Sequence, residues 1–146
     1  MSTLVTGYLV TGSVSLALLA VAWRWPRAGR LAFAVLFLGA AVFNAVTALR
    51  TPDVYVTGFG PRAFPPMREV IEGVVALAPG AFVLAVAAGQ LLVGAGLALG
   101  RGLAFRLAIV GGATFLAGIS WLGTGAAFPT NLVLAAGVVM LARGER

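Results

Sequence analysis

The sequence predicts an all-α protein, a bundle of transmembrane helices. Of its 146 residues, 61% are hydrophobic and 10% are charged, with a mean hydropathy of +1.06. A soluble domain carries roughly 25% charged residues, and this chain has too few polar residues to cover a soluble core. Long apolar runs separated by arginines complete the pattern. The length allows one domain, which we take as residues 1–146.

The apolar runs predict five membrane spans. They cover residues 4–23, 31–49, 80–99, 107–122 and 126–142. A run of about twenty residues at ~1.5 Å per residue reaches ~30 Å, the thickness of the hydrocarbon layer. The fifth run is short, but Pro129 is tolerated in a first helical turn and Arg143 can extend its side chain to the interface.

The first run is predicted to be a retained span and not a cleaved signal peptide. Ala20-Val21-Ala22 resembles a cleavage site, but the arginines follow the apolar run instead of preceding it. A signal peptide needs positive charge before its apolar region, and residues 1–6 carry no basic side chain.

The basic residues predict the topology. All ten are arginines, and the chain contains no lysine, histidine or cysteine. Seven lie in the first and third connections and at the C-terminus, namely Arg24, Arg27, Arg30, Arg101, Arg106, Arg143 and Arg146; three lie in the second connection, namely Arg50, Arg62 and Arg68. Because arginine-rich connections stay in the cytoplasm, we expect a multi-pass protein of the cell (inner) membrane with its N-terminus outside and its C-terminus in the cytoplasm.

The outer connection, residues 51–79, is predicted to be an irregular Pro/Gly-rich loop followed by a short amphipathic helix at the membrane interface. The helix would begin at Pro66 and end at Pro79. Its apolar residues recur at helical spacing, namely Met67, Val70, Ile71, Val74, Val75 and Ala78. This segment is either a lid over a cavity between the spans or a connector resting on lipid.

The composition excludes several kinds of chemistry. Without cysteine or histidine there is no thiolate nucleophile, no zinc site with N/S ligands and no His-ligated haem. No ionisable residue lies in the middle of a span, which disfavours a proton-coupled transporter. The net charge of +6 is explained by topology and anionic lipid better than by nucleic acid. We therefore expect no catalytic residue, no metal site and no intrinsic cofactor.

The candidate binding residues are neutral amides inside the spans and charged groups of the outer loop. An unpaired amide in hydrocarbon is costly, so Asn44 and Gln90 should either hydrogen-bond to each other or to backbone across helices, or contact a bound head group or quinone-like ligand. The carboxylates Glu69 and Glu72 are close enough in sequence to Arg62 and Arg68 to be neutralised by them.

From Arg30 onward the chain resembles the DoxX-like small membrane proteins. The residues that carry the resemblance are Arg30-Leu31, Phe37-Leu38-Gly39, Asn44, Gly89-Gln90-Leu91-Leu92-Val93-Gly94, Leu97-Ala98-Leu99-Gly100-Arg101 and Asn131-Leu132. The similarity covers residues 30–142. Gln90 stands where that family often has an acidic residue, and the first span is an addition to the usual four. The resemblance implies an accessory subunit of a quinone-linked oxidoreductase assembly, with a quinone or lipid contact.

Two functions remain from the sequence. The first is a non-catalytic membrane subunit or anchor that contacts membrane lipids and a membrane or peripheral oxidoreductase subunit. The second is a small-molecule transport or permeation protein, whose pathway would use Asn44, Gln90 and Thr114. A continuous polar cavity open at both faces would favour transport, whereas a dry bundle with one lateral groove would favour the subunit.

Overall fold

The computed structural model describes residues 3–126 and 128–145, and these form helices with no strand among them. The α-helices are α1 (Thr3–Arg24), α2 (Pro26–Arg50), α3 (Val54–Phe59), α4 (Met67–Gly73), α5 (Pro79–Leu99), α6 (Gly102–Ile119) and α7 (Thr130–Met140). The 3-10 segments are η1 (Gly60–Arg62), η2 (Val75–Leu77), η3 (Ser120–Ala126) and η4 (Leu141–Glu145). Ala127 of the predicted fifth span, Met1 and Ser2 of the N-terminal segment without basic side chains, and Arg146 of the charge count lie outside the described residues.

Four helical segments are long and apolar enough to cross a membrane, as expected for a multi-pass membrane protein. They are α1, α2, α5 and the continuous stretch of α6 with η3. The fourth begins at Gly102, earlier than the predicted residue 107, because Arg106, which we expect to precede the span, is the fifth residue of α6. The stretch corresponding to the fifth run, Thr130–Gly144, is apolar but shorter than the other four.

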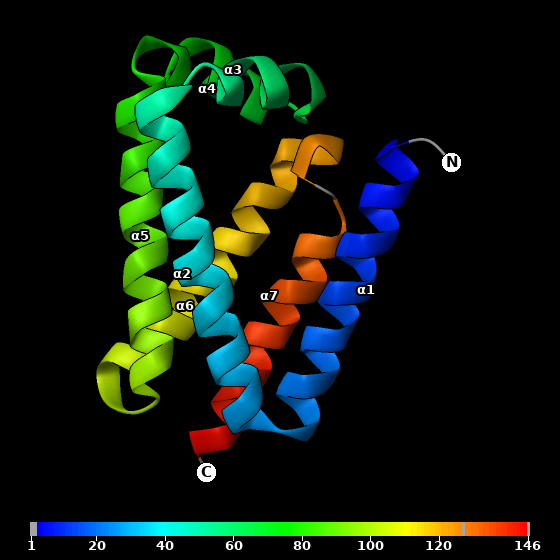
Figure 1. The fold of residues 1–146 in the computed structure, drawn as a ribbon, viewed down its shortest axis with the longest axis vertical. Coiled ribbons are helices and arrows are strands. Elements are labelled where there is room, and N and C mark those ends of the chain that lie inside the picture. The colour runs from blue at the N-terminus through cyan, green and yellow to red at the C-terminus, as the bar shows by residue number, and fades with distance from the viewer. Residues whose placement is uncertain (1–2, 127, 146) are drawn as a thin grey trace.

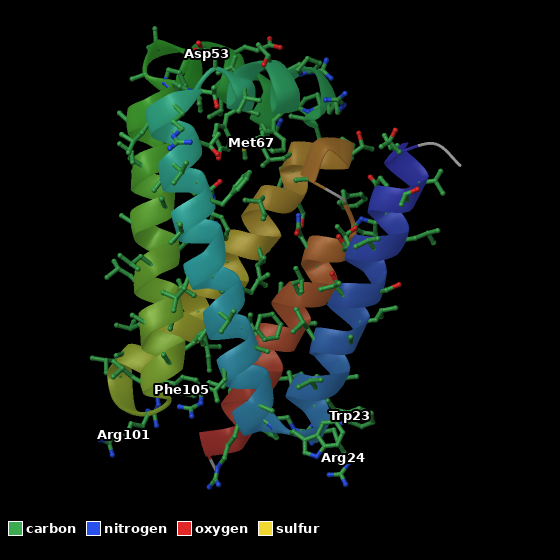
Figure 2. The ribbon with its side chains drawn as sticks, in the orientation of Figure 1. Trp23, Arg24, Asp53, Met67, Arg101 and Phe105 are labelled. Carbon is green, nitrogen blue, oxygen red and sulfur yellow. The ribbon has the colours of Figure 1, made fainter. Side chains whose placement is uncertain are left out.

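The long helices alternate in direction, and the two termini lie at opposite ends of the bundle (Figure 1). Helix α2 packs along α5, α6 packs against both α5 and α7, and α1 packs on α7 and α2. The short helices α3 and α4 lie across one end (Figure 1). Figure 2 shows Asp53 and Met67 at that end and Trp23, Arg24 and Arg101 at the other.

Proline and glycine set the ends of the long helices. Pro26 and Pro79 occupy the first positions of α2 and α5, where the missing N–H leaves no hydrogen bond broken. Helix α5 ends at Gly100, whose φ of 69° places it in the left-handed region that terminates helices. The chain therefore reverses direction within a few residues between α1 and α2 and between α5 and α6, which holds each pair antiparallel.

The hydrophobic core occupies the half of the bundle nearest the arginine-rich end. Among its members are the buried residues Phe33, Phe37, Leu97, Phe105 and Leu141. They come from the first half of α2, the last half of α5, the start of α6 and the start of η4. Large side chains therefore fill this half of the bundle, and the end near α3 and α4 is left less tightly packed.

The outer connection contains more helix than expected. We expected an irregular segment before Pro66, but residues 54–59 form α3. The helix expected from Pro66 to Pro79 begins one residue later at Met67, ends at Gly73 and is followed by the 3-10 turn η2. Gly73 explains the early end, because a glycine is a poor residue for the interior of a helix.

Glycine permits the closest approach between α5 and α6. A Cβ atom added to Gly96 would lie 2.7 Å from the Ala108 Cβ and 2.8 Å from the Ala104 carbonyl oxygen. The Gly96–Gly100 pair thus serves packing inside the bundle, because small residues let helix backbones come together. By contrast, a Cβ on Gly89 of the same helix would meet no atom within 4 Å.

We predict that Gly96→Ala lowers the free energy of unfolding by about 1–3 kcal/mol, because overpacking a close helix contact forces the helices apart. Gly89→Ala, the matched control on α5, should leave it unchanged or slightly raised. Thermal unfolding in detergent, followed by circular dichroism, measures both. Equal shifts in the two variants would contradict the tight α5–α6 contact.

Candidate functional site

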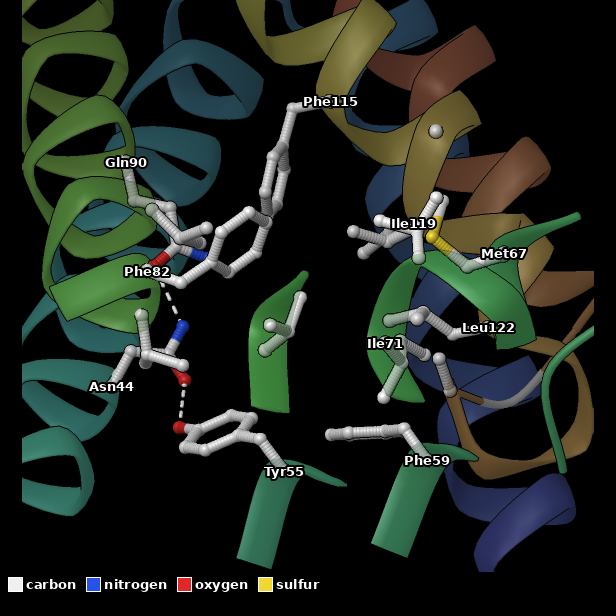
Figure 3. Close-up of a pocket in the computed structure, with 16 residues that line it drawn as sticks. Asn44, Tyr55, Phe59, Met67, Ile71, Phe82, Gln90, Phe115, Ile119 and Leu122 are labelled. Carbon is white, nitrogen blue, oxygen red and sulfur yellow. Dashed lines mark hydrogen bonds between the residues drawn. The ribbon is translucent and has the colours of Figure 1, made fainter. Parts of the chain in front are cut away.

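A cavity of about 400 Å³ lies at the end of the bundle that α3 and α4 cover. Helices α2, α5 and α6 form its walls, and side chains of α3 and α4 cover its outer end, with Tyr55 and Phe59 at the bottom of the view in Figure 3. It is lined by Asn44, Tyr55, Phe59, Met67, Val70, Ile71, Val75, Phe82, Val83, Val86, Gln90, Phe115, Gly118, Ile119, Leu122 and Ala126. The lining carries no charged side chain, so the cavity favours a neutral, largely apolar occupant.

Three neutral polar side chains form a hydrogen-bonded chain at one wall of the cavity. The Asn44 amide Nδ2 donates to the Gln90 Oε1 at 2.7 Å, which joins α2 to α5. The Tyr55 hydroxyl donates to the Asn44 Oδ1 at 2.5 Å, which joins α3 to α2 (Figure 3). The expected pairing of the two amides is therefore present, and a third residue from the outer connection completes it.

The chain leaves one donor directed at the cavity. Gln90 is only 5% exposed, and its Nε2 has no hydrogen-bond partner among the described residues. Among the described residues, no fully buried side-chain nitrogen or oxygen lacks a hydrogen-bond partner. The unpaired Nε2 is therefore not fully enclosed, and it opens onto the cavity that Gln90 lines. An occupant that carries a carbonyl or another acceptor could satisfy this donor.

Tyr55 is held in its protonated, donating form. Burial raises the pKa of its hydroxyl above the ordinary value, with a smaller opposing effect from the Thr47 hydroxyl. Near neutral pH the hydroxyl is therefore a donor, and the Asn44 oxygen accepts from it. This fixes the orientation of the Asn44 amide, whose nitrogen must then point to Gln90.

Aromatic rings supply much of the remaining wall. Phe82 of α5 and Phe115 of α6 lie beside Gln90, while Phe59 of α3 lies near Tyr55 (Figure 3). The Tyr55 and Phe59 ring centroids are 5.9 Å apart, a distance typical of stacked aromatic pairs. Flat apolar faces close to one hydrogen-bond donor are suited to a ring or an acyl chain that carries a polar group.

The predicted charged residues of the outer loop do not line the cavity. The guanidinium of Arg62 donates to the Gly58 carbonyl at 2.8 Å, and that of Arg68 donates to the Pro61 and Ala63 carbonyls at 3.3 Å each. The expected neutralisation of Glu69 and Glu72 by these arginines is not formed in the described part of the chain, where both carboxylates are exposed. The arginines instead hold the backbone of the outer connection in place.

Of the three neutral residues predicted to line a pathway, only two lie at the cavity. Asn44 and Gln90 meet, but Thr114 is exposed and is not part of the lining. Sequence reasoning missed Tyr55, Phe82 and Phe115. Tyr55 alone had a recognisable signal, as the one hydroxyl-bearing aromatic residue of the outer connection. Among the described residues, no group of three or more Asp, Glu, His or Cys side chains could hold a metal ion.

No family model matches the chain, and neither a curated protein nor a solved structure does.

We predict a measurable coupling between Asn44 and Gln90. Gln90→Leu and Asn44→Leu should each lower the free energy of unfolding, because each leaves the other amide unpaired in an apolar wall. The double variant should lose less than the sum, with a coupling energy on the order of 1 kcal/mol. Strictly additive losses, measured by thermal unfolding in detergent, would show that the pair is not formed.

Proposed function

We propose that the protein is a non-catalytic membrane protein, an accessory or anchoring subunit of a quinone-linked membrane oxidoreductase assembly. In this function it holds a small neutral molecule of the bilayer, a quinone or a lipid, in the cavity between α2, α5 and α6. The observation that carries the proposal is the apolar cavity with one inward-facing donor, the Gln90 amide. The lining contains no charged side chain that could stabilise an ionic substrate.

The arrangement of the interior favours this function over transport. The polar side chains of the lining are Asn44, Tyr55 and Gln90, and they cluster at one wall instead of following a path through the bundle. Towards the arginine-rich end, buried Phe33, Phe37 and other core residues fill the space between the helices. A permeating polar solute would lose its hydration there without new partners.

A lateral route from the lipid suits such a ligand. Gly118 of α6 lines the cavity and is exposed, as is Phe82 of α5, so the cavity communicates with the outer surface of the bundle. In a membrane that surface faces acyl chains. A quinone carbonyl could accept a hydrogen bond from the Gln90 Nε2 while its ring lies between aromatic walls.

The DoxX-like resemblance supports the assignment as a subunit. Two sets of the residues that carry it are in contact across helices. Asn44 pairs with Gln90, and the Arg30 guanidinium donates to the Ala98 carbonyl at 3.3 Å beside Gly100. Residues far apart in the sequence thus serve the same α2–α5 junction.

We further propose five spans, with the N-terminus outside the cell and the C-terminus in the cytoplasm. Helix α7 with η4 would be the fifth span, completed by Arg143 reaching to the interface. Helices α3 and α4 would lie in the outer interface, above the cavity. The arginines counted as cytoplasmic then share one end of the bundle, as the labelled Arg24 and Arg101 do (Figure 2).

Filling the cavity tests the function. A Cβ on Gly118 meets no atom within 4 Å, so Gly118→Leu should place a side chain in the cavity without disturbing the fold. We predict that this variant loses the quinone or lipid that copurifies with the wild type in mild detergent, measured by mass spectrometry of solvent extracts. Gly89→Leu, on an open face outside the cavity, is the control and should retain it.

The same preparations test the subunit assignment. A defined oxidoreductase subunit should copurify with the wild type in stoichiometric amount. A monodisperse protein that carries neither a partner nor a quinone or lipid would overturn the proposal.

The topology is testable because the chain contains no cysteine, so that single-cysteine variants report one site each. Thr57 in α3 and Ala28 at the start of α2 are both exposed. We predict that a membrane-impermeant maleimide labels Thr57→Cys in intact cells and labels Ala28→Cys only after permeabilisation. The opposite result would reverse the proposed orientation. If both cysteines were labelled in intact cells, the chain could not cross the membrane an odd number of times between residues 28 and 57.

A further inference from the structure

A second pocket, of about 210 Å³, lies at the arginine-rich end of the bundle, opposite the apolar cavity. It is formed where the start of α2 meets the end of α5 and the last turns of the chain. It is lined by Pro26, Arg27, Arg30, Gly100, Phe105, Leu141 and Gly144. Two arginines line this pocket, whereas the cavity has no charged residue, so the two sites suit ligands of different chemistry.

Arg30 is held in place by the end of α5. Its guanidinium donates to the Ala98 carbonyl at 3.3 Å, where the carbonyl end of the helix favours a cation. Gly100 makes this possible, because a Cβ at this position would collide with the guanidinium. The backbone of Gly100 is also left-handed, with a φ of 69°. The pocket therefore has one fixed positive wall.

Among the side chains that the structure describes, none neutralises the second arginine. The Arg27 side chain is exposed and has no hydrogen bond or ion pair within the described residues. It sits in the first turn of α2, where the unpaired N–H groups and the helix dipole add positive potential. Asp53 and the α4 residues Glu69 and Glu72 belong to the opposite end of the bundle. Of the acidic residues, only Glu145 belongs to this end by sequence position.

We propose that this pocket binds a phosphate group, carried either by a phospholipid head group or by a free phosphate ester. Two guanidinium groups and a helix N-terminus are the groups that bind phosphate oxygens in proteins. Phe105 and Leu141 lie behind these groups and are almost completely buried, so the open surface of the pocket is mainly polar, as a phosphate group requires. The site is separate from the cavity, and the proposal does not depend on the function proposed above.

Arg24 provides a matched control for Arg27. Both are exposed arginines of the same connection, so replacing either removes the same charge. Arg24 does not line the pocket, however, and its guanidinium lies 5.5 Å from the centroid of the Trp25 ring. A difference between Arg24→Gln and Arg27→Gln therefore separates a defined pocket from a general attraction of anions to this end.

The full-length chain in neutral detergent would be titrated with dioctanoyl phosphatidylglycerol and followed by native mass spectrometry. Dioctanoylglycerol, which lacks the phosphate, is the ligand control. We predict that the phosphatidylglycerol binds, that Arg27→Gln weakens this binding about tenfold through loss of a charge-assisted contact, and that Arg24→Gln changes it less than about twofold. Arg27→Lys should lie between, since it keeps the charge and loses the planar fork. Circular dichroism melting checks that the variants fold.

Glycerol 3-phosphate distinguishes the two sources of phosphate. If it binds the wild type as tightly as the lipid and displaces it, the occupant is a free ester; if only the lipid binds, the occupant is a head group. Equal losses in Arg24→Gln and Arg27→Gln, or equal binding of dioctanoylglycerol, would overturn the proposal. So would phosphate binding that appears only in Glu145→Gln, because the carboxylate of the chain itself would then be the occupant.

Discussion

The Asn44–Gln90 hydrogen bond is the interaction on which the rest of the outer half depends. Two amides placed in an apolar wall must find partners, since an unpaired amide in hydrocarbon costs several kcal/mol. Their pairing joins α2 to α5. The Tyr55 hydroxyl donates to the Asn44 Oδ1, which joins the outer connection to the same pair of helices. One polar requirement thus positions two spans and the helices that cover them.

The same requirement creates the binding potential of the cavity. Because the Gln90 oxygen is used by Asn44, its nitrogen remains as a donor facing an otherwise apolar space. The core residues on the arginine-rich side fill their half of the bundle with aromatic and aliphatic side chains. One half of the bundle is therefore packed, and the other half, next to the outer connection, contains the cavity. The proposal of a binding site, and not of a channel, rests on this asymmetry.

The arginine-rich end follows a different physical principle. Arginines gather in the connections and near the ends of the helices, where the carbonyl end of α5 stabilises Arg30, whereas the positive N-terminal end of α2 gives no such stabilisation to Arg27. Arg30 uses its carbonyl contact to brace the α2–α5 pair at this end, just as Asn44 and Gln90 brace it at the other. Arg27, three residues earlier, has no such contact among the described residues, and it is the group on which the proposed phosphate site depends.

The sequence alone determined the helical class, the four longest apolar helices and the positions of the connections, because hydrophobic runs and arginines act locally and need no knowledge of packing. It also indicated that Asn44 and Gln90 need hydrogen-bond partners, with each other, with backbone or with a ligand, and the structure shows that they pair. It could not predict that Tyr55 joins them, that Arg62 and Arg68 bind backbone carbonyls, or that Thr114 lies outside the cavity. Those outcomes depend on which faces of α2, α5 and α6 meet and on how the outer connection folds over them. The weak apolar periodicity of these helices leaves those faces undetermined until the chain is packed.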